Sequence, residues 1–309
     1  MTATCLPAAP SGGRPVPGVV TDDGVTLDVR IRGRSGPVVV LSHGFTVDSE
    51  DWAPELPALR GRARVVTWDQ RGHGRSGWGD PDRGTVEQTG RDLARVVDAV
   101  AGESDPVVLV GHSMGGLSIL ALARQRPEWF GTRVRGALLV ATSAGELVRD
   151  GPIGLAHLAA RRLGVMPAVA ATARLAAPFA DRLPWRASRI GRWATRRMLF
   201  TGDATDEEVD RAQERTERLP LVVGSAFGVA LLDYDGTAAL PVLARLPVTV
   251  VAAGADRLTP AGHGERLVAA LGPHAELVRV EDAAHAVNLT HHEVVDAALA
   301  GVLERARLG

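Results

Sequence analysis

Residues 107–116 read Val-Val-Leu-Val-Gly-His-Ser-Met-Gly-Gly and join a short apolar run to an Ala- and Leu-rich segment. The run 107–110 is typical of a strand buried on both faces, and residues 114–126 favour a helix. A serine between them, with glycine two residues before and after, suits a tight turn where the strand and helix backbones pass close together. We therefore predict a strained turn that exposes Ser113 at the end of a strand.

Short apolar runs recur along the chain and alternate with helix-like stretches. The predicted strands are residues 25–31, 37–41, 63–68, 106–110, 136–141, 247–253 and 275–280. The predicted helices are residues 50–59, 87–100, 114–126, 262–271 and 293–307, with Thr259-Pro260 expected to begin the fourth. This alternation predicts an α/β fold with a mainly parallel, doubly wound sheet.

The pattern also suggests how the chain is divided. Residues 1–18 are rich in Pro, Gly and Ala and are expected to form a flexible tail. Residues 19–144 and 244–309 carry the alternating pattern and should form one core. Residues 145–243 contain helical segments without a convincing strand, and we expect a helical cap insertion there.

Composition excludes several classes of chemistry. All 35 basic residues are Arg, so lysine Schiff-base chemistry and a phosphate-loop lysine are impossible. Cys5 is the only cysteine, which excludes an internal disulfide and favours a cytoplasmic protein. The net charge of −1 gives no attraction to nucleic acid, and no apolar stretch is long enough for membrane insertion. The residues from Gly72 to Gly77 match a dinucleotide-binding pattern, but no helix can follow, so we predict no cofactor. His291-His292-Glu293 lacks the i, i+4 histidine pair of a helical zinc site, so we predict no metal.

Four motifs appear in the order found in one known superfamily. They are Ser42-His43-Gly44-Phe45, Asp69-Gln70-Arg71-Gly72-His73-Gly74-Arg75-Ser76, Gly254-Ala255-Asp256-Arg257-Leu258-Thr259-Pro260 and Asp282-Ala283-Ala284-His285. Together with the turn at Ser113, they make residues 25–307 resemble the α/β-hydrolase superfamily.

The resemblance implies a role for each site residue. Ser113 would attack an acyl carbonyl, His285 would act as general base, and Asp256 would orient the imidazole. The backbone N–H groups of Phe45 and Met114 would form the oxyanion hole.

Other residues compete for two of these roles. His112, His291 and His292 are alternative bases, although His112 is expected to point away from the serine and the other two to lie on the surface. Glu146 is the alternative acid. His43 is expected to shape the oxyanion loop. The sequence also departs from the superfamily after His285, where Asn288-Leu289-Thr290 stands in place of a common carboxylate.

The predicted cap is basic in its first half and acidic in its second. Residues 149–197 contain ten Arg and only two acidic residues. This charge pattern is typical of solvated helix faces or of a lid for anionic substrates. Its apolar side chains could line a pocket above Ser113 or form the core of the cap itself. They are Leu155, Leu158, Leu163, Met166, Leu175, Phe179, Trp185, Trp193, Met198, Leu199 and Phe200.

These observations predict a serine hydrolase that cleaves a carboxylic ester or a related acyl bond, such as a lactone or thioester, of a small apolar substrate. Carbon–carbon bond hydrolysis, acyl transfer and cofactor-free perhydrolysis are alternatives that could use the same triad. A non-catalytic ligand-binding protein on this fold is another alternative.

Overall fold

The computed structural model describes residues 13–145, 147, 152–165, 168, 172, 176, 181, 189–202 and 204–308. In this part of the chain, eight strands form one sheet in the order β1-β2-β4-β3-β5-β6-β7-β8. The pairs β1–β2 and β2–β4 are antiparallel, and all other pairs are parallel. The strands are β1 (Arg14–Pro15), β2 (Val29–Arg32), β3 (Val38–Ser42), β4 (Arg64–Trp68), β5 (Val107–His112), β6 (Val134–Val140), β7 (Val248–Ala253) and β8 (Ala275–Val280).

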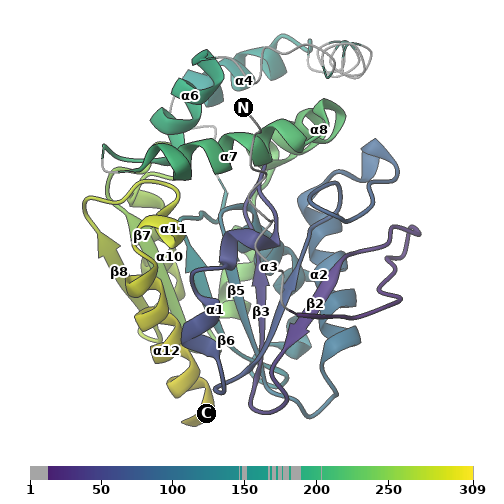
Figure 1. Cartoon of the computed structure of the whole chain (residues 1–309), viewed down its shortest axis with the longest axis vertical. Helices are drawn as coiled ribbons and strands as arrows, with labels where there is room; N and C mark the ends of the chain where they lie inside the picture. Colours follow the sequence, from purple (N-terminus) through teal and green to yellow (C-terminus); the bar gives the residue numbers. More distant parts are fainter. Residues whose placement is uncertain are drawn as a thin grey trace, which may run out of the picture.

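Helices cover both faces of the sheet (Figure 1). One apolar core packs beneath α2 (Val86–Val100), α3 (Met114–Gln125), α9 (Leu240–Leu243) and α10 (Gly262–Leu271). A second core packs beneath α1 (Leu56–Leu59), α11 (Val287–Thr290) and α12 (His292–Leu308). This cover on both faces confirms the predicted doubly wound α/β fold. Short 3-10 turns among the described residues complete the connections: η1 (Ser49–Trp52), η2 (Pro81–Arg83), η3 (Pro127–Trp129) and η5 (Thr237–Ala239).

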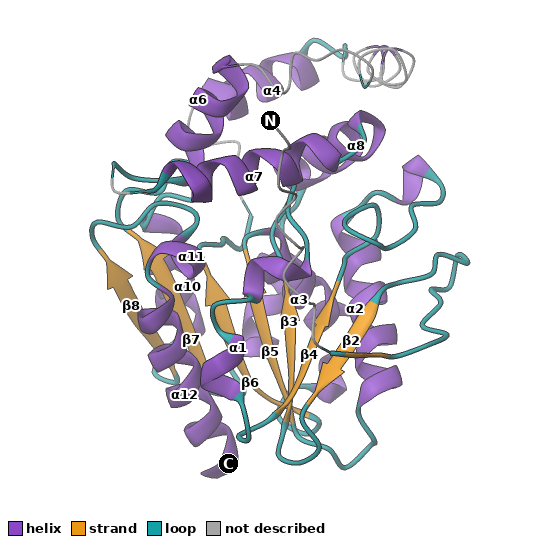
Figure 2. Ribbon diagram, in the orientation of Figure 1, coloured by secondary structure: helices purple, strands orange, loops and turns teal. Residues whose placement is uncertain are grey.

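In the described part of the chain, several helices lie beyond one end of the strands (Figure 2). They are α4 (Pro152–Arg162), α6 (Arg189–Leu199), α7 (Asp206–Arg218) and α8 (Leu221–Asp233). The described part of residues 145–243 contains helices and no strand beyond an isolated bridge from Gly145 to Asp235. Near the end of this segment, Tyr234, Leu240 and Leu243 pack into the first core. The division into tail, core and cap stays a prediction.

Three local expectations differ from the structure. Arg14 and Pro15, expected in the tail, pair with β2 because their backbone groups continue the sheet edge. The helix expected at residues 50–59 is instead the pair η1 and α1, since prolines at positions 54 and 57 cannot donate to a helical ladder. Thr259 does not begin α10, which starts at Gly262. Its N–H and hydroxyl bond to Asp256 instead.

The turn between β5 and α3 brings two backbones together. Ser113 has φ 50° and ψ −115°, a conformation that costs a residue with a side chain on the order of 1–3 kcal/mol. A Cβ atom on Gly111 would lie 2.5 Å from the backbone of Gly115, and one on Gly115 would overlap the carbonyl oxygen of Ser42. Only glycine fits at either position, so the spacing around Ser113 has a steric cause.

Replacing Gly115 with alanine should therefore destabilise the fold. The added methyl group meets backbone rather than a flexible side chain, so we expect Gly115→Ala to lower the free energy of unfolding by about 2 kcal/mol or more. Urea denaturation measures this change. Gly228→Ala is the matched control, because a Cβ on Gly228 meets no atom within 4 Å. Equal stability of the two variants would contradict the close approach.

Candidate active site

Ser113 lies at the carboxyl end of β5 and is the residue immediately before α3. Its N–H donates to the carbonyl of Val140 (2.9 Å), and its carbonyl accepts from the Thr142 hydroxyl (2.7 Å). The loop after β3 passes directly beside it, because a Cβ on Gly44 would lie 3.4 Å from the Ser113 Cβ. Bonds on both sides thus hold the strained backbone of Ser113.

Asp256 and His285 are hydrogen-bonded to each other. Nδ1 of His285 donates to Oδ2 of Asp256 at 2.8 Å, and both residues are buried. Because Nδ1 carries the proton, Nε2 of the neutral ring is left as an acceptor. The pair therefore has the tautomer that a general base needs.

Three further donors surround the Asp256 carboxylate. The N–H groups of Leu258 and Thr259 bond to Oδ1 at 2.8 and 2.9 Å, and the Thr259 hydroxyl bonds to Oδ2 at 2.7 Å. Burial alone would raise the pKa of Asp256, but His285 and the Thr259 donors together hold it below its usual range. The carboxyl group is thus kept as an anion facing the imidazole.

The three candidate residues follow β5, β7 and β8, whose carboxyl ends share one edge of the sheet. His112, next to Ser113, provides the direct contact between these segments. Its ring centroid lies 5.0 Å from that of His285, and its Nε2 donates to the His285 carbonyl at 2.9 Å. Burial, followed by the neighbouring His285, lowers the pKa of His112 to about 4. His112 is therefore a neutral hydrogen-bond donor at pH 7.

Phe45 follows Gly44 in the loop beside Ser113, and Met114 is the residue directly after the serine. Among the described residues, neither backbone N–H has a hydrogen-bond acceptor. Met114 is the first residue of α3, so its N–H also belongs to the positive end of that helix. Two unpaired donors near a serine are the arrangement that an oxyanion hole requires.

The other candidate residues have structural surroundings. His43 donates from Nδ1 to the Gly44 carbonyl (2.7 Å) and accepts at Nε2 from the Gln70 N–H (2.9 Å), so it joins two loops. His291 and His292 are partly exposed and face acidic neighbours. Glu146 lies outside the described residues.

Apolar residues from α8 and the turn before it pack against Met114, the residue after Ser113. Leu219, Val223 and Phe227 form a buried cluster with Met114. Of the apolar residues expected above Ser113, Leu199 and Phe200 pack in a separate cluster with α7, while Leu163 and Trp193 are exposed. Met166, Leu175, Phe179 and Trp185 lie outside the described residues.

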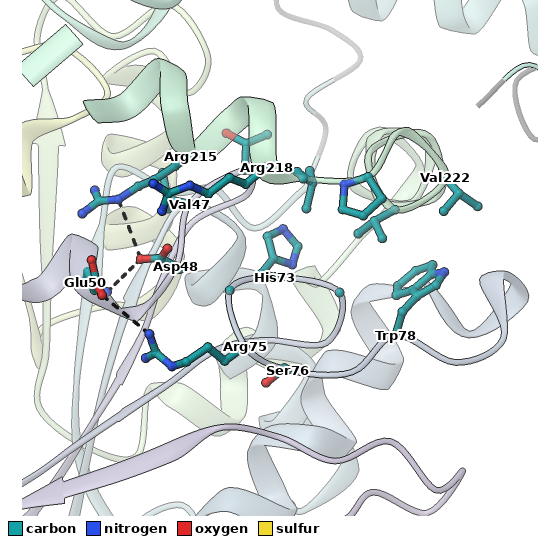
Figure 3. A pocket seen from close by; sticks show the side chains of 16 residues that line it. Val47, Asp48, Glu50, His73, Arg75, Ser76, Trp78, Arg215, Arg218 and Val222 are labelled. Atoms are coloured by element: carbon teal, nitrogen blue, oxygen red, sulfur yellow. Dashed lines mark hydrogen bonds and ion pairs between the residues drawn. The ribbon is translucent and has the colours of Figure 1, made fainter. Parts of the chain in front are cut away.

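A cavity of about 340 Å³ lies beside the loop that follows Phe45. It is lined by parts of residues 46–50 and 72–78 and by the junction of α7 and α8. Figure 3 shows Arg75 paired with Glu50 and Arg215 paired with Asp48 in this cavity. Of the described residues, Ser113, Asp256 and His285 are not part of its lining.

Sequence reasoning missed some residues around the triad. Thr259, Asp51 and Asn288 all bond to site residues or to each other. Thr259 stands in the acid motif and Asn288 was noted only as a departure from the superfamily, while Asp51 belongs to neither. Over the ranges that the structure describes, no group of three His, Cys, Asp or Glu side chains is arranged to hold a metal ion. No described helix is both long and apolar enough to cross a membrane.

Comparison with known proteins identifies the family. The chain matches the alpha/beta hydrolase family over residues 39–297, and it belongs to this family. Its sheet and topology agree with this membership. The predicted superfamily is thereby confirmed, and the chain is placed among hydrolytic enzymes.

Individual relatives that align over most of this chain share less than a third of their aligned residues with it. The protein named "Putative carbamate hydrolase RutD" from Agrobacterium fabrum is 29% identical over 276 residues, which cover 88% of this chain and 96% of that protein. The polyketide synthase ThaQ from Burkholderia thailandensis is 30% identical over 282 residues, which cover 89% of this chain but only 12% of ThaQ. A hydrolase structure from Pseudomonas aeruginosa PA01 has a TM-score of 0.70 and 26% identity, covering 96% of this chain and 99% of that one.

Thr259→Val should make the ionised form of Asp256 less stable in the folded protein. Loss of the hydroxyl donor raises the pKa of Asp256 toward that of a free carboxyl, so we expect the free energy of unfolding at pH 7 to fall by about 1–2 kcal/mol. A carboxyl group whose pKa is lower in the folded state stabilises the fold at pH values above its unfolded-state pKa of about 4. This stabilisation is lost as the pH falls further. The difference in free energy of unfolding between Thr259→Val and wild type should therefore become smaller below about pH 4.

Urea denaturation between pH 7 and pH 3 measures this effect. Thr259→Ser keeps the hydroxyl and is the matched control, so it should stay close to wild type. A Thr259→Val deficit that does not change with pH would show that the hydroxyl does not act on the Asp256 charge.

Proposed function

We propose that the protein is a serine hydrolase that cleaves a carboxylic ester or a related acyl bond, such as a lactone or thioester, through an acyl-enzyme. The observation that carries this proposal is the 2.8 Å hydrogen bond between His285 and Asp256, at the sheet edge that also bears Ser113. Family membership supports hydrolysis as the class of reaction.

In the proposed mechanism, Nε2 of His285 accepts the Ser113 proton as the hydroxyl oxygen attacks the acyl carbonyl. The oxyanion that forms is stabilised by the N–H groups of Phe45 and Met114. His285 then returns the proton to the leaving group, and Asp256 stabilises the imidazolium formed in between. Water repeats the sequence on the acyl-enzyme and releases the acid.

The proposed substrate is a small molecule with an apolar part. Support comes from the apolar side chains of Leu219, Val223 and Phe227, which surround Met114 next to the serine. The name of the Agrobacterium fabrum relative refers to carbamate hydrolysis, and a carbamate is also an acyl carbon bonded to oxygen.

We also propose that the protein works in the cytoplasm and without nucleic acid as a partner. The single cysteine, Cys5, supports a reducing compartment. The net charge of −1 gives no general attraction for a polyanion.

A fluorophosphonate probe tests the role of Ser113 directly. We expect one covalent adduct by intact mass on the wild-type protein and none on Ser113→Ala, because only an activated serine attacks the probe. Ser143→Ala is the matched control, a buried serine after β6 that should leave labelling intact. Failure of the folded wild-type protein to react would contradict the proposal and favour a ligand-binding protein.

Steady-state hydrolysis of 4-nitrophenyl acetate tests the triad as a unit. We expect Ser113→Ala and His285→Ala each to lower kcat by a factor of about 10⁴ or more, since each removes the activated nucleophile. The double variant should be little worse than either single variant. If the factor by which kcat falls in the double variant equals the product of the two single-variant factors, the residues act independently.

A further inference from the structure

Asp51 is a buried side chain outside the proposed triad that contacts three separate segments. It lies in η1 with 2% of its surface exposed. Its Oδ2 accepts from Nδ2 of Asn288 at 3.0 Å, and its Oδ1 accepts from Nη1 of Arg215 at 3.2 Å. Its Oδ2 also lies 3.6 Å from Nδ1 of His112. One carboxylate therefore meets the end of β5, the segment after His285, and helix α7.

Two of these contacts restrain the segment that carries His285. Asn288 follows His285 by three residues in α11, and its Nδ2 also bonds to the backbone carbonyl of Asp51 at 3.1 Å. At the other end, His112 donates to the His285 carbonyl, while Trp52 of η1 packs edge-on against the His112 ring at 6.4 Å. The short η1 turn thus supports His285 from both sides.

The contact between Asp51 and His112 is not itself a hydrogen bond. The only proton of neutral His112 is used on Nε2, so Nδ1 presents a lone pair toward the carboxylate. Asp51 therefore acts on the His285 segment through Asn288, and His112 is held by packing and by its own bond to the His285 carbonyl.

Arg215 supplies the positive charge that Asp51 needs. Its side chain is 14% exposed and also lies 3.7 Å from Oδ1 of Asp48. Burial, together with the nearby charge of Asp51, raises the pKa of Glu55, a buried acid in the same region, well above its usual value. Removing one partner of such a buried pair leaves an uncompensated charge, which strongly destabilises this arrangement unless the structure moves.

We propose that Asp51 is a positioning residue for His285, and that its ion pair with Arg215 couples the placement of helix α7 to the alignment of the His285 imidazole. This inference rests on the proposed function. When Arg215 is in place, Asp51 keeps η1 and Asn288 fixed and His285 faces Ser113. When Arg215 is lost, the uncompensated carboxylate shifts η1, and the His285 segment shifts with it.

The test compares two Arg→Gln changes on the same helix. Arg215→Gln removes the ion pair, whereas Arg211→Gln removes an exposed charge one turn away and is the matched control. With 4-nitrophenyl acetate, we expect Arg215→Gln to lower kcat at least about 10-fold with little change in KM, since a small misalignment of a catalytic group costs this much. Fluorophosphonate labelling of Ser113 should slow by a similar factor. Arg211→Gln should remain within about twofold of wild type.

A second variant tests the contact between Asp51 and the segment that carries His285. Asn288→Ala leaves Arg215 and α7 unchanged but removes the bond to the His285 segment, so it should give a similar loss of kcat. Arg215→Lys, which keeps the charge, should recover part of the rate lost in Arg215→Gln.

The outcomes separate this inference from the proposed function. If wild-type protein is labelled but folded Arg215→Gln and Asn288→Ala keep wild-type kcat and labelling rates, the positioning role is overturned. A change in KM alone in Arg215→Gln would also overturn it, because the arginine would then only shape the substrate site. If wild-type protein is not labelled at all, the proposed function fails and the positioning role fails with it.

Discussion

The contact between the backbones of β5 and α3 sets the geometry on which the candidate site depends. Gly111 and Gly115 leave no room for a side chain, so the chain must turn sharply at Ser113 and adopt a positive φ there. A strained residue of this kind persists only where its surroundings hold it. Here the bonds to Val140 and Thr142 join the turn to β6 and the residues that follow it. The partly exposed position of the serine is thus a consequence of how the central strands pack.

The sequence was most informative where one local segment determines the structure. Buried parallel strands need continuous apolar runs, and six of the seven predicted strands match observed ones within two residues at each end. The first predicted strand, residues 25–31, is the exception, because pairing with β4 begins only at Val29. The turn at Ser113 was also predictable, since a glycine stands two residues before and two residues after the serine, and the first of them, Gly111, is required by its contact with Gly115.

Contacts between distant segments left no signal in the sequence. Asp51 and Asn288 are 237 residues apart, and neither belongs to a motif, so their hydrogen bond could not be anticipated. The same holds for Leu219, Val223 and Phe227, which reach Met114 only because α8 folds back over the sheet. Apolar side chains in the predicted cap could equally have packed against each other, and Leu199 and Phe200 do so.

The acid and the base are therefore held in place by different means. Asp256 takes three of its hydrogen bonds from Leu258 and Thr259, which lie within three residues, so a single turn orients its carboxylate. His285 has no such local support, and its backbone is fixed by His112 from another strand. A local turn survives many changes elsewhere in the chain, whereas a position set by tertiary contacts moves when the contacting elements move. The alignment of the base is accordingly the part of this site that is most sensitive to changes in distant segments.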